Sequence, residues 1–71
     1  MSEIKRRHTP YLKLKGFFVQ NNIKQKDVAQ LLDKSKSALN QNINGTGGDF
    51  SLSEVRLLCN EYKISADEFF M

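Results

Sequence analysis

The chain has 71 residues, a mass of 8.2 kDa and one cysteine, which suits one small domain that buries only about 60% of the surface its unfolded form exposes. So small a core leaves no room for a deep catalytic cavity. The longest apolar run is three residues, far short of a membrane span. Cys59 has no partner for a disulfide and His8 is the only histidine. We therefore expect the protein to reside in a reducing cytoplasm and to have no metal site, no cofactor and no enzymatic activity.

The net charge of +3 is distributed unevenly along the chain. Residues 1–36 contain nine Lys and Arg against three acidic residues, a balance of +6, whereas residues 37–71 contain two against five, a balance of −3. A basic half favours an anionic partner, such as a nucleic-acid backbone or an acidic protein surface. The alternative is that the charge only keeps the protein soluble.

Helix signals recur along the whole sequence, and no stretch alternates apolar and polar residues long enough for a strand, so we expect an all-α fold. Residues 1–8 lack an apolar period and are predicted to be a flexible basic leader before a single domain over residues 9–71. Thr9 and Pro10 predict the start of the first helix, because the hydroxyl can cap free N–H groups and proline suits the first helical position. This helix is predicted to end near Asn22. Its inward side chains are Leu14, Phe17 and Phe18.

The second helix is predicted from Gln25 to about Leu32, and the third begins after Ser35 as its N-cap. The third helix ends at Gly45, because glycine readily takes the positive φ that closes a helix. The inward side chains of these two helices are Val28, Ala29, Leu32, Leu39 and Ile43.

The segment 46–49 contains two adjacent glycines and is predicted to be the most flexible loop. Ser51 and Glu54 then form a capping box that opens a fourth helix, and a short fifth helix follows Ser65. The predicted inward face of the fourth helix consists of Leu52, Val55, Leu58, Cys59 and Tyr62. The whole is a compact bundle of five helices.

Residues 25–45 point to a function, because the third helix shows hydrogen-bonding groups on its outer faces. An α-helix fits the major groove of duplex DNA, where an Asn or Gln side chain can donate to and accept from the same adenine. Asn40, Gln41 and Asn42 follow one another although Asn is a poor residue inside a helix, which favours selection for contacts. Lys34 and Lys36 add positive charge, unless they are simply solvated surface residues.

On these residues the chain resembles the Cro and lambda-repressor helix-turn-helix family over residues 12–70. The motifs that carry the resemblance are Gln25, the Val28-Ala29 pair, Leu32, the Ser35-Lys36-Ser37 entry to the third helix, Leu39 and the closing Asn44-Gly45. The resemblance implies a lambda-repressor-like domain that binds duplex operator DNA, commonly as a two-fold dimer.

The same resemblance implies roles for single positions. Gln25 corresponds to the residue that contacts a phosphate and braces the recognition helix, Lys36, Ser37 and Asn40 to base-facing residues, and Asn44 to a phosphate contact. The full set of candidate DNA-binding residues is Gln25, Lys34, Lys36, Ser37, Asn40, Gln41 and Asn44.

The chain departs from the family pattern in the turn and in the interior. The turn usually has glycine and then an apolar residue, whereas this chain has Asp33 and Lys34. Many relatives pair an Arg in the first helix with a Glu in the third, where this chain has Phe18 and Ile43. We expect an apolar contact to replace that ion pair, an exchange that can be neutral or stabilising.

The chain also resembles, more closely, the modulators of repression, small lytic-switch proteins of temperate lactococcal phages. This implies a regulator in the cytoplasm of a bacterial host that acts with or against a phage repressor protein. Five apolar residues look surplus to so small a core and are candidates for that partner interface, although scattered exposed apolar residues are normal. They are Leu12, Val19, Leu31, Leu57 and Phe70.

Two mechanisms of gene regulation therefore stay open: a complex with a phage repressor, with DNA contact as an addition, and direct operator binding of the Cro type. No membrane or small-molecule ligand is expected. The basic leader residues Lys5, Arg6 and Arg7 could follow phosphates or a minor groove, or serve as a solubilising tail.

Overall fold

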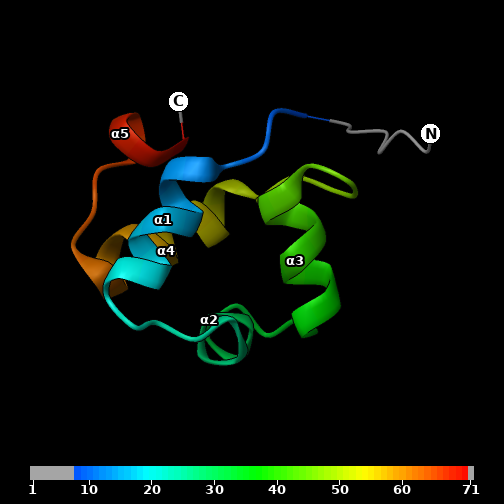
Figure 1. The fold of residues 1–71 in the computed structure, drawn as a ribbon, viewed down its shortest axis with the longest axis horizontal. Helices are drawn as coiled ribbons and strands as arrows, with labels where there is room; N and C mark the ends of the chain where they lie inside the picture. Colours follow the sequence, from blue (N-terminus) through cyan, green and yellow to red (C-terminus); the bar gives the residue numbers. More distant parts are fainter. Residues whose placement is uncertain (1–7, 71) are drawn as a thin grey trace.

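The structure is a computed structural model that describes residues 8–70, and all regular secondary structure in this range is helical (Figure 1). The five helices are α1 (Leu12–Gln20), α2 (Gln25–Leu31), α3 (Lys36–Asn44), α4 (Leu52–Tyr62) and α5 (Ala66–Phe70). This confirms the predicted all-α fold. None of these helices is long and apolar enough to cross a bilayer.

The first helix begins later than predicted, at Leu12 with Tyr11 as a cap residue that makes no side-chain capping bond. Thr9 and Pro10 lie before the helix in a segment without regular secondary structure. The reason is a tertiary hydrogen bond, because the Tyr11 N–H donates over 2.8 Å to the Ile43 carbonyl of α3. That contact holds the segment against α3, so the helix begins only after Tyr11.

Four helices end in the same way, with one residue in the left-handed conformation. These residues are Asn22, Asp33, Gly45 and Lys63, with φ between 55° and 77°. In each case the next N–H donates back to the carbonyl five residues earlier, as Lys34 does to Ala29 over 3.0 Å. This bond satisfies a carbonyl that the helix end would leave unpaired and turns the chain sharply.

The core lies between α1, α2, α3 and α4, and it contains the predicted inward residues of the first three helices except Phe17, which is half-buried and packs against it. Its buried side chains are Leu14, Phe18, Val28, Ala29, Leu32, Leu39, Ile43, Phe50 and Leu58. Phe18 and Ile43 are both buried there, as expected for an apolar replacement of the family ion pair.

Leu52 corrects the prediction for α4, because its side chain is 67% exposed. The buried line of α4 passes through Val55, Leu58 and Tyr62, and Leu52 lies off that line at the open first turn. The inward place beside this turn is filled instead by Phe50, from the preceding loop. The predicted capping box of Ser51 and Glu54 is confirmed.

The glycine-containing loop is held on two sides. The Tyr11 hydroxyl donates over 2.6 Å to Asp49 Oδ1, and Asn42 Nδ2 donates over 2.6 Å to the Gly48 carbonyl. His8, assigned to the leader, also contacts this region, since its N–H donates to the Gly45 carbonyl over 3.4 Å. Hydrogen bonds to α1's entry and to α3 therefore fix the loop that was predicted to be the most flexible.

Candidate nucleic-acid interface

The helices α2 and α3 cross steeply, as Figure 1 shows by viewing α2 nearly end-on while α3 runs in the plane. Asp33 takes the left-handed conformation that the turn needs, with φ 55°. Ser35 then caps α3, its hydroxyl accepting from the Ala38 N–H over 3.0 Å. Together the turn and the cap fix where α3 starts relative to α2.

The outer face of α3 is open to solvent. Lys36, Ser37, Asn40 and Gln41 are exposed, whereas Leu39 on the opposite face is fully buried. The structure thus brings four of the predicted site residues together on one accessible helix surface, next to the beginning of α2.

Gln25, Asn40 and Asn44 form a chain of side-chain amides across α2 and α3. Asn40 Nδ2 donates to Gln25 Oε1 over a long 3.5 Å, and Asn44 Nδ2 donates to Asn40 Oδ1 over 2.8 Å. Gln25 and Asn44 are half-buried. Gln25 therefore contacts the recognition helix, in line with the bracing role implied for it.

The amide of Asn40 keeps capacity for a further partner. A primary amide has two N–H donors and two acceptor lone pairs, and the contacts with Gln25 and Asn44 use one of each. One donor and one acceptor remain on an exposed side chain, which is the pair of groups that adenine recognition requires. The internal contacts also restrict the rotamer of Asn40, so less conformational entropy is lost on binding.

Gln41 is exposed but lies along the glycine loop. A Cβ on Gly47 would come within 2.5 Å of Gln41 Oε1 and 2.8 Å of Gln41 Cβ. The absence of a side chain at Gly47 thus makes space for Gln41 at the end of α3.

Asn42 is the member of the amide row that the sequence interpretation placed wrongly. Its side chain is buried, with 5% of the residue exposed. It donates to the Gly48 carbonyl and accepts from Lys34 Nζ, both over 2.6 Å. Because Asn42 lies three residues after the buried Leu39, it points inward and serves the interior.

Lys34 also differs from an exposed DNA-contacting lysine. Its ammonium lies 2.6 Å from Glu54 Oε2 as well as 2.6 Å from Asn42 Oδ1, with only 17% of the side chain exposed. The ring of Phe50 lies beneath it, 5.7 Å from the nitrogen to the centroid. These internal partners separate Lys34 from the solvent-exposed Lys36.

The pKa of Glu54 reflects this arrangement. Burial by itself raises the pKa of this carboxyl, but the hydrogen bond from Lys34, the Ser51 N–H and the Lys34 charge outweigh it. The net result is a pKa below the ordinary value of 4.5. The carboxylate is therefore ionised at neutral pH and pairs with the ammonium.

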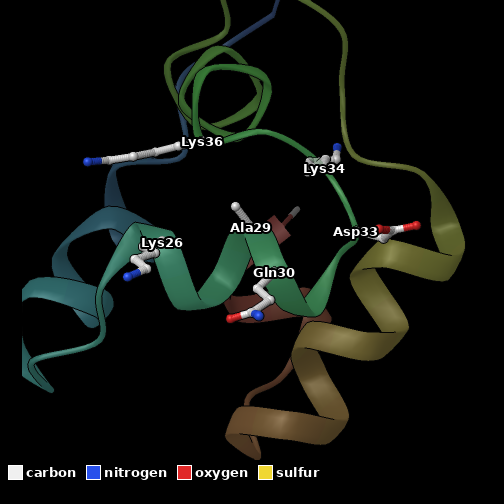
Figure 2. A pocket seen from close by; sticks show the side chains of 6 residues that line it. All are labelled: Lys26, Ala29, Gln30, Asp33, Lys34 and Lys36. Carbon is white, nitrogen blue, oxygen red and sulfur yellow. The ribbon is translucent and has the colours of Figure 1, made fainter.

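A shallow hollow of about 400 Å³ lies between α2 and the start of α3 (Figure 2). The Lys26 and Lys36 side chains extend on the same side of it, and Gln30 and Asp33 line other parts of its wall. The two lysines give this side of the helix pair positive charge, which Asp33 partly offsets.

The five predicted partner-interface residues divide into two groups. Leu12, Val19 and Leu57 are exposed, at 69%, 72% and 44%. Leu31 and Phe70 are half-buried and pack against the core. The prediction that Leu31 and Phe70 are surplus to the core is therefore wrong.

The ring contacts of Phe70 give the physical reason for its burial. Its centroid lies 5.5 Å from that of Tyr11 and 5.6 Å from that of Phe50. Both neighbours belong to segments without regular structure. The helical pattern alone did not indicate that these segments close over the core.

Sequence reasoning missed Phe50 altogether and did not recognise the interior role of Asn42. Both residues shape the site. Phe50 directly precedes the Ser51 N-cap, the position where an apolar residue commonly packs back on the first turns of a helix. That signal could have identified it. The leader residues Lys5, Arg6 and Arg7, considered for DNA contact, lie outside the described residues.

Comparison with known protein families gives a match over most of the chain. The helix-turn-helix family model matches residues 14–69, which include all of α2, the turn, α3 and α4. Searches of curated proteins and of solved structures gave no significant match. With most of its length matched and with two crossed helices joined by a tight turn, the chain belongs to the helix-turn-helix family of DNA-binding regulators.

Proposed function

We propose that the chain is a transcription regulator that binds duplex DNA with the outer face of α3 in the major groove. The observation that carries this proposal is the exposed polar face of α3 in a chain of the helix-turn-helix family. The proposed contact residues are Gln25, Lys36, Ser37, Asn40, Gln41 and Asn44. We leave Lys34 out of this set because its ammonium is engaged inside the protein.

Within this set, Lys36 and Ser37 lie in the first turn of α3, the part that reaches base edges when a recognition helix enters the groove. Asn40 follows one turn later with a free donor and acceptor. Gln25 is the first residue of α2, and the phosphate contact proposed for it is the role that the family resemblance implies.

The first test is binding to a labelled duplex that the wild-type protein selects from a randomised pool. Asn40→Ala should weaken binding to that duplex by about 10-fold to 100-fold, the discrimination of one bidentate amide contact. Asn60→Ala, which removes an exposed amide from α4, is the matched control and should bind as wild type does. Equal affinities of the two variants would contradict the assignment of α3.

A salt titration of the same complex tests the electrostatic part. The logarithm of the association constant should fall by about 0.9 per phosphate contacted for each tenfold rise in salt. Binding that ignores salt would exclude a phosphate-contacting surface.

A second candidate function is a complex with a phage repressor in a lysis-lysogeny switch, in the cytoplasm of a bacterial host. The observation that favours it is the exposure of Leu12 and Val19, seven residues apart and so on one face of α1, together with Leu57 on α4. The resemblance to the phage modulators of repression supports a repressor as the partner. This mechanism is compatible with DNA contact by α3.

The second test mixes the purified chain with the repressor encoded beside it and measures the mass of the complex by size-exclusion chromatography with light scattering. The double change Leu12→Ser and Val19→Ser should abolish co-elution. Leu52→Ser, which alters a leucine of similar exposure outside the proposed interface, should leave it intact. Separate elution of the two wild-type proteins would rule out this candidate.

A further inference from the structure

The strongest unassigned feature is a group of polar side chains inside the helix-turn-helix, which we call the Lys34 cluster. It consists of Lys34, Asn42 and Glu54 with the Gly48 carbonyl, joined by three contacts of 2.6 Å. Lys34 and Glu54 each expose less than a fifth of their side chains. In the family pattern an apolar residue usually stands at the position of Lys34.

The cluster connects four separate parts of the fold. Lys34 lies in the turn after α2, Asn42 on α3, Gly48 in the glycine loop and Glu54 in the first turn of α4. Glu54 is itself fixed, because its other carboxylate oxygen accepts from the Ser51 N–H over 2.9 Å in the capping box. The turn and the recognition helix are thereby tied to the rigid start of α4.

The contact with Asn42 acts directly on α3. Asn42 faces inward two residues after the outward-facing Asn40, so any rotation or shift of α3 that breaks the cluster also moves the DNA-reading face. Hydrogen bonds in which one partner is charged are shorter and stronger than neutral ones. A cation that is shared by two acceptors therefore joins α3 to the turn and to the start of α4.

We propose that Lys34 is a positioning residue that fixes the recognition helix through Asn42 and Glu54, rather than a residue that touches DNA. To contact a phosphate, its ammonium would have to leave two partners at 2.6 Å and the face of Phe50. Lys36, two residues further along the chain, is exposed and reaches solvent without that loss. The inference rests on the proposed DNA binding for its effect on affinity, while the restraint on α3 exists without DNA.

The first measurement needs no DNA and follows amide hydrogen exchange along the chain. Lys34→Ala should raise exchange in the second half of α3 by at least about tenfold, within the range of coupling inside one polar network. The change in α1 should be much smaller. Uniform acceleration over all helices would show loss of global stability only and would overturn the proposal.

The second measurement uses the duplex selected by the wild-type protein and its salt dependence. Lys34→Ala should weaken binding by about tenfold with an unchanged salt slope, whereas loss of a phosphate contact lowers the slope by about 0.9. Lys36→Ala gives the comparison for an exposed lysine at the interface. Lys15→Ala removes the same charge from an exposed site on α1 and controls for net charge.

A double variant separates position from charge and remains useful if Lys34→Ala fails to fold. Lys34→Met with Glu54→Gln removes both charges of the ion pair together, an exchange that protein interiors can accept. Asn42 can still donate to the Gly48 carbonyl in this variant. If Lys34 only positions α3, this variant should recover wild-type affinity within about threefold.

Three results would overturn the inference: a reduced salt slope for Lys34→Ala, a double variant that stays weak, or a Lys34→Ala protein identical to wild type. Failure of the proposed function looks different, since the wild-type protein then selects no duplex. In that case selective exchange in α3 of Lys34→Ala still supports the restraint, and uniform exchange refutes it.

Discussion

Asp33 sits at the sharpest point of the turn, with φ 55°, where a residue with a Cβ is strained. Aspartate tolerates this conformation better than most residues, which explains how the turn forms without the usual glycine. Its carboxylate also lines the hollow beside Lys26 and Lys36. Asp33 therefore has two unfavourable effects, backbone strain and, in the DNA complex proposed above, repulsion from the phosphates.

Two substitutions separate these effects. Asp33→Gly should raise the free energy of unfolding by about 0.5 to 1 kcal/mol, because glycine takes positive φ without strain. Asp33→Asn keeps the tolerance of left-handed geometry and removes only the charge. Both variants should bind the selected duplex more tightly than wild type at low salt, and only the glycine variant should unfold at clearly higher urea. A glycine variant less stable than wild type would contradict the strain argument.

Asn42 shows where reasoning from residue type fails. Its amide was grouped with Asn40 and Gln41 by chemistry, but its spacing from Leu39 and Ile43 already placed it on the inward face. An inward amide needs partners inside the protein, and the sequence did not reveal that Lys34 and Gly48 supply them. Those partners come from a turn and a loop, whose paths are fixed only when the whole chain is folded.

At the scale of elements, the sequence predicted the number, type and order of the helices and most of their boundaries. Three signals that act within about one turn are confirmed, the caps at Ser35 and Ser51 and the glycine end at Gly45, whereas the Thr9-Pro10 start is not. The bonds at the confirmed ends join groups three to five residues apart, so the local sequence determines them.

Boundaries set by distant contacts were not predictable in this way. The start of α1 depends on the bond from Tyr11 to α3, and no local pattern encodes it. Lys63 ends α4 in the left-handed conformation with no residue-type signal at all. The exposed half of the candidate site was recognised from the sequence, because the period of α3 defined its outer face. The Lys34 cluster beneath it was not recognised.

Two polar contacts between distant segments matter for the molecule as a whole, and both contain a carboxylate. Glu54 joins α4 to the turn through Lys34, and Asp49 accepts from Tyr11 over 2.6 Å. Burial raises the pKa of Asp49, but the bonds from Tyr11 and the Phe50 N–H and the His8 charge lower it overall. Burial and the same contact with Asp49 raise the pKa of Tyr11 to about 12.

These shifts predict that the fold loses stability in acid. A carboxyl whose pKa is lower in the folded state than in the unfolded chain stabilises the fold above the unfolded value and loses this effect as the pH falls through the folded value. For Glu54 and Asp49 the ordinary values are 4.5 and 3.8. The melting temperature should therefore be nearly constant from pH 7 to 5 and fall steadily below about pH 4.5.

Glu54→Gln identifies the part of this dependence that comes from the Lys34 cluster. The amide oxygen can still accept from the Ser51 N–H, so the capping box survives while the charge facing Lys34 is removed. At pH 7 the variant should melt several degrees below wild type, since about 1 kcal/mol shifts the melting temperature of a domain this size by roughly 4 to 8 °C. Circular dichroism melts at successive pH values should show the two proteins converging as the pH falls below 4.5 and through the folded-state pKa of Glu54, because the wild-type carboxyl is then protonated too. A difference that stays constant down to pH 3 would mean that the ion pair contributes nothing to the stability of this fold.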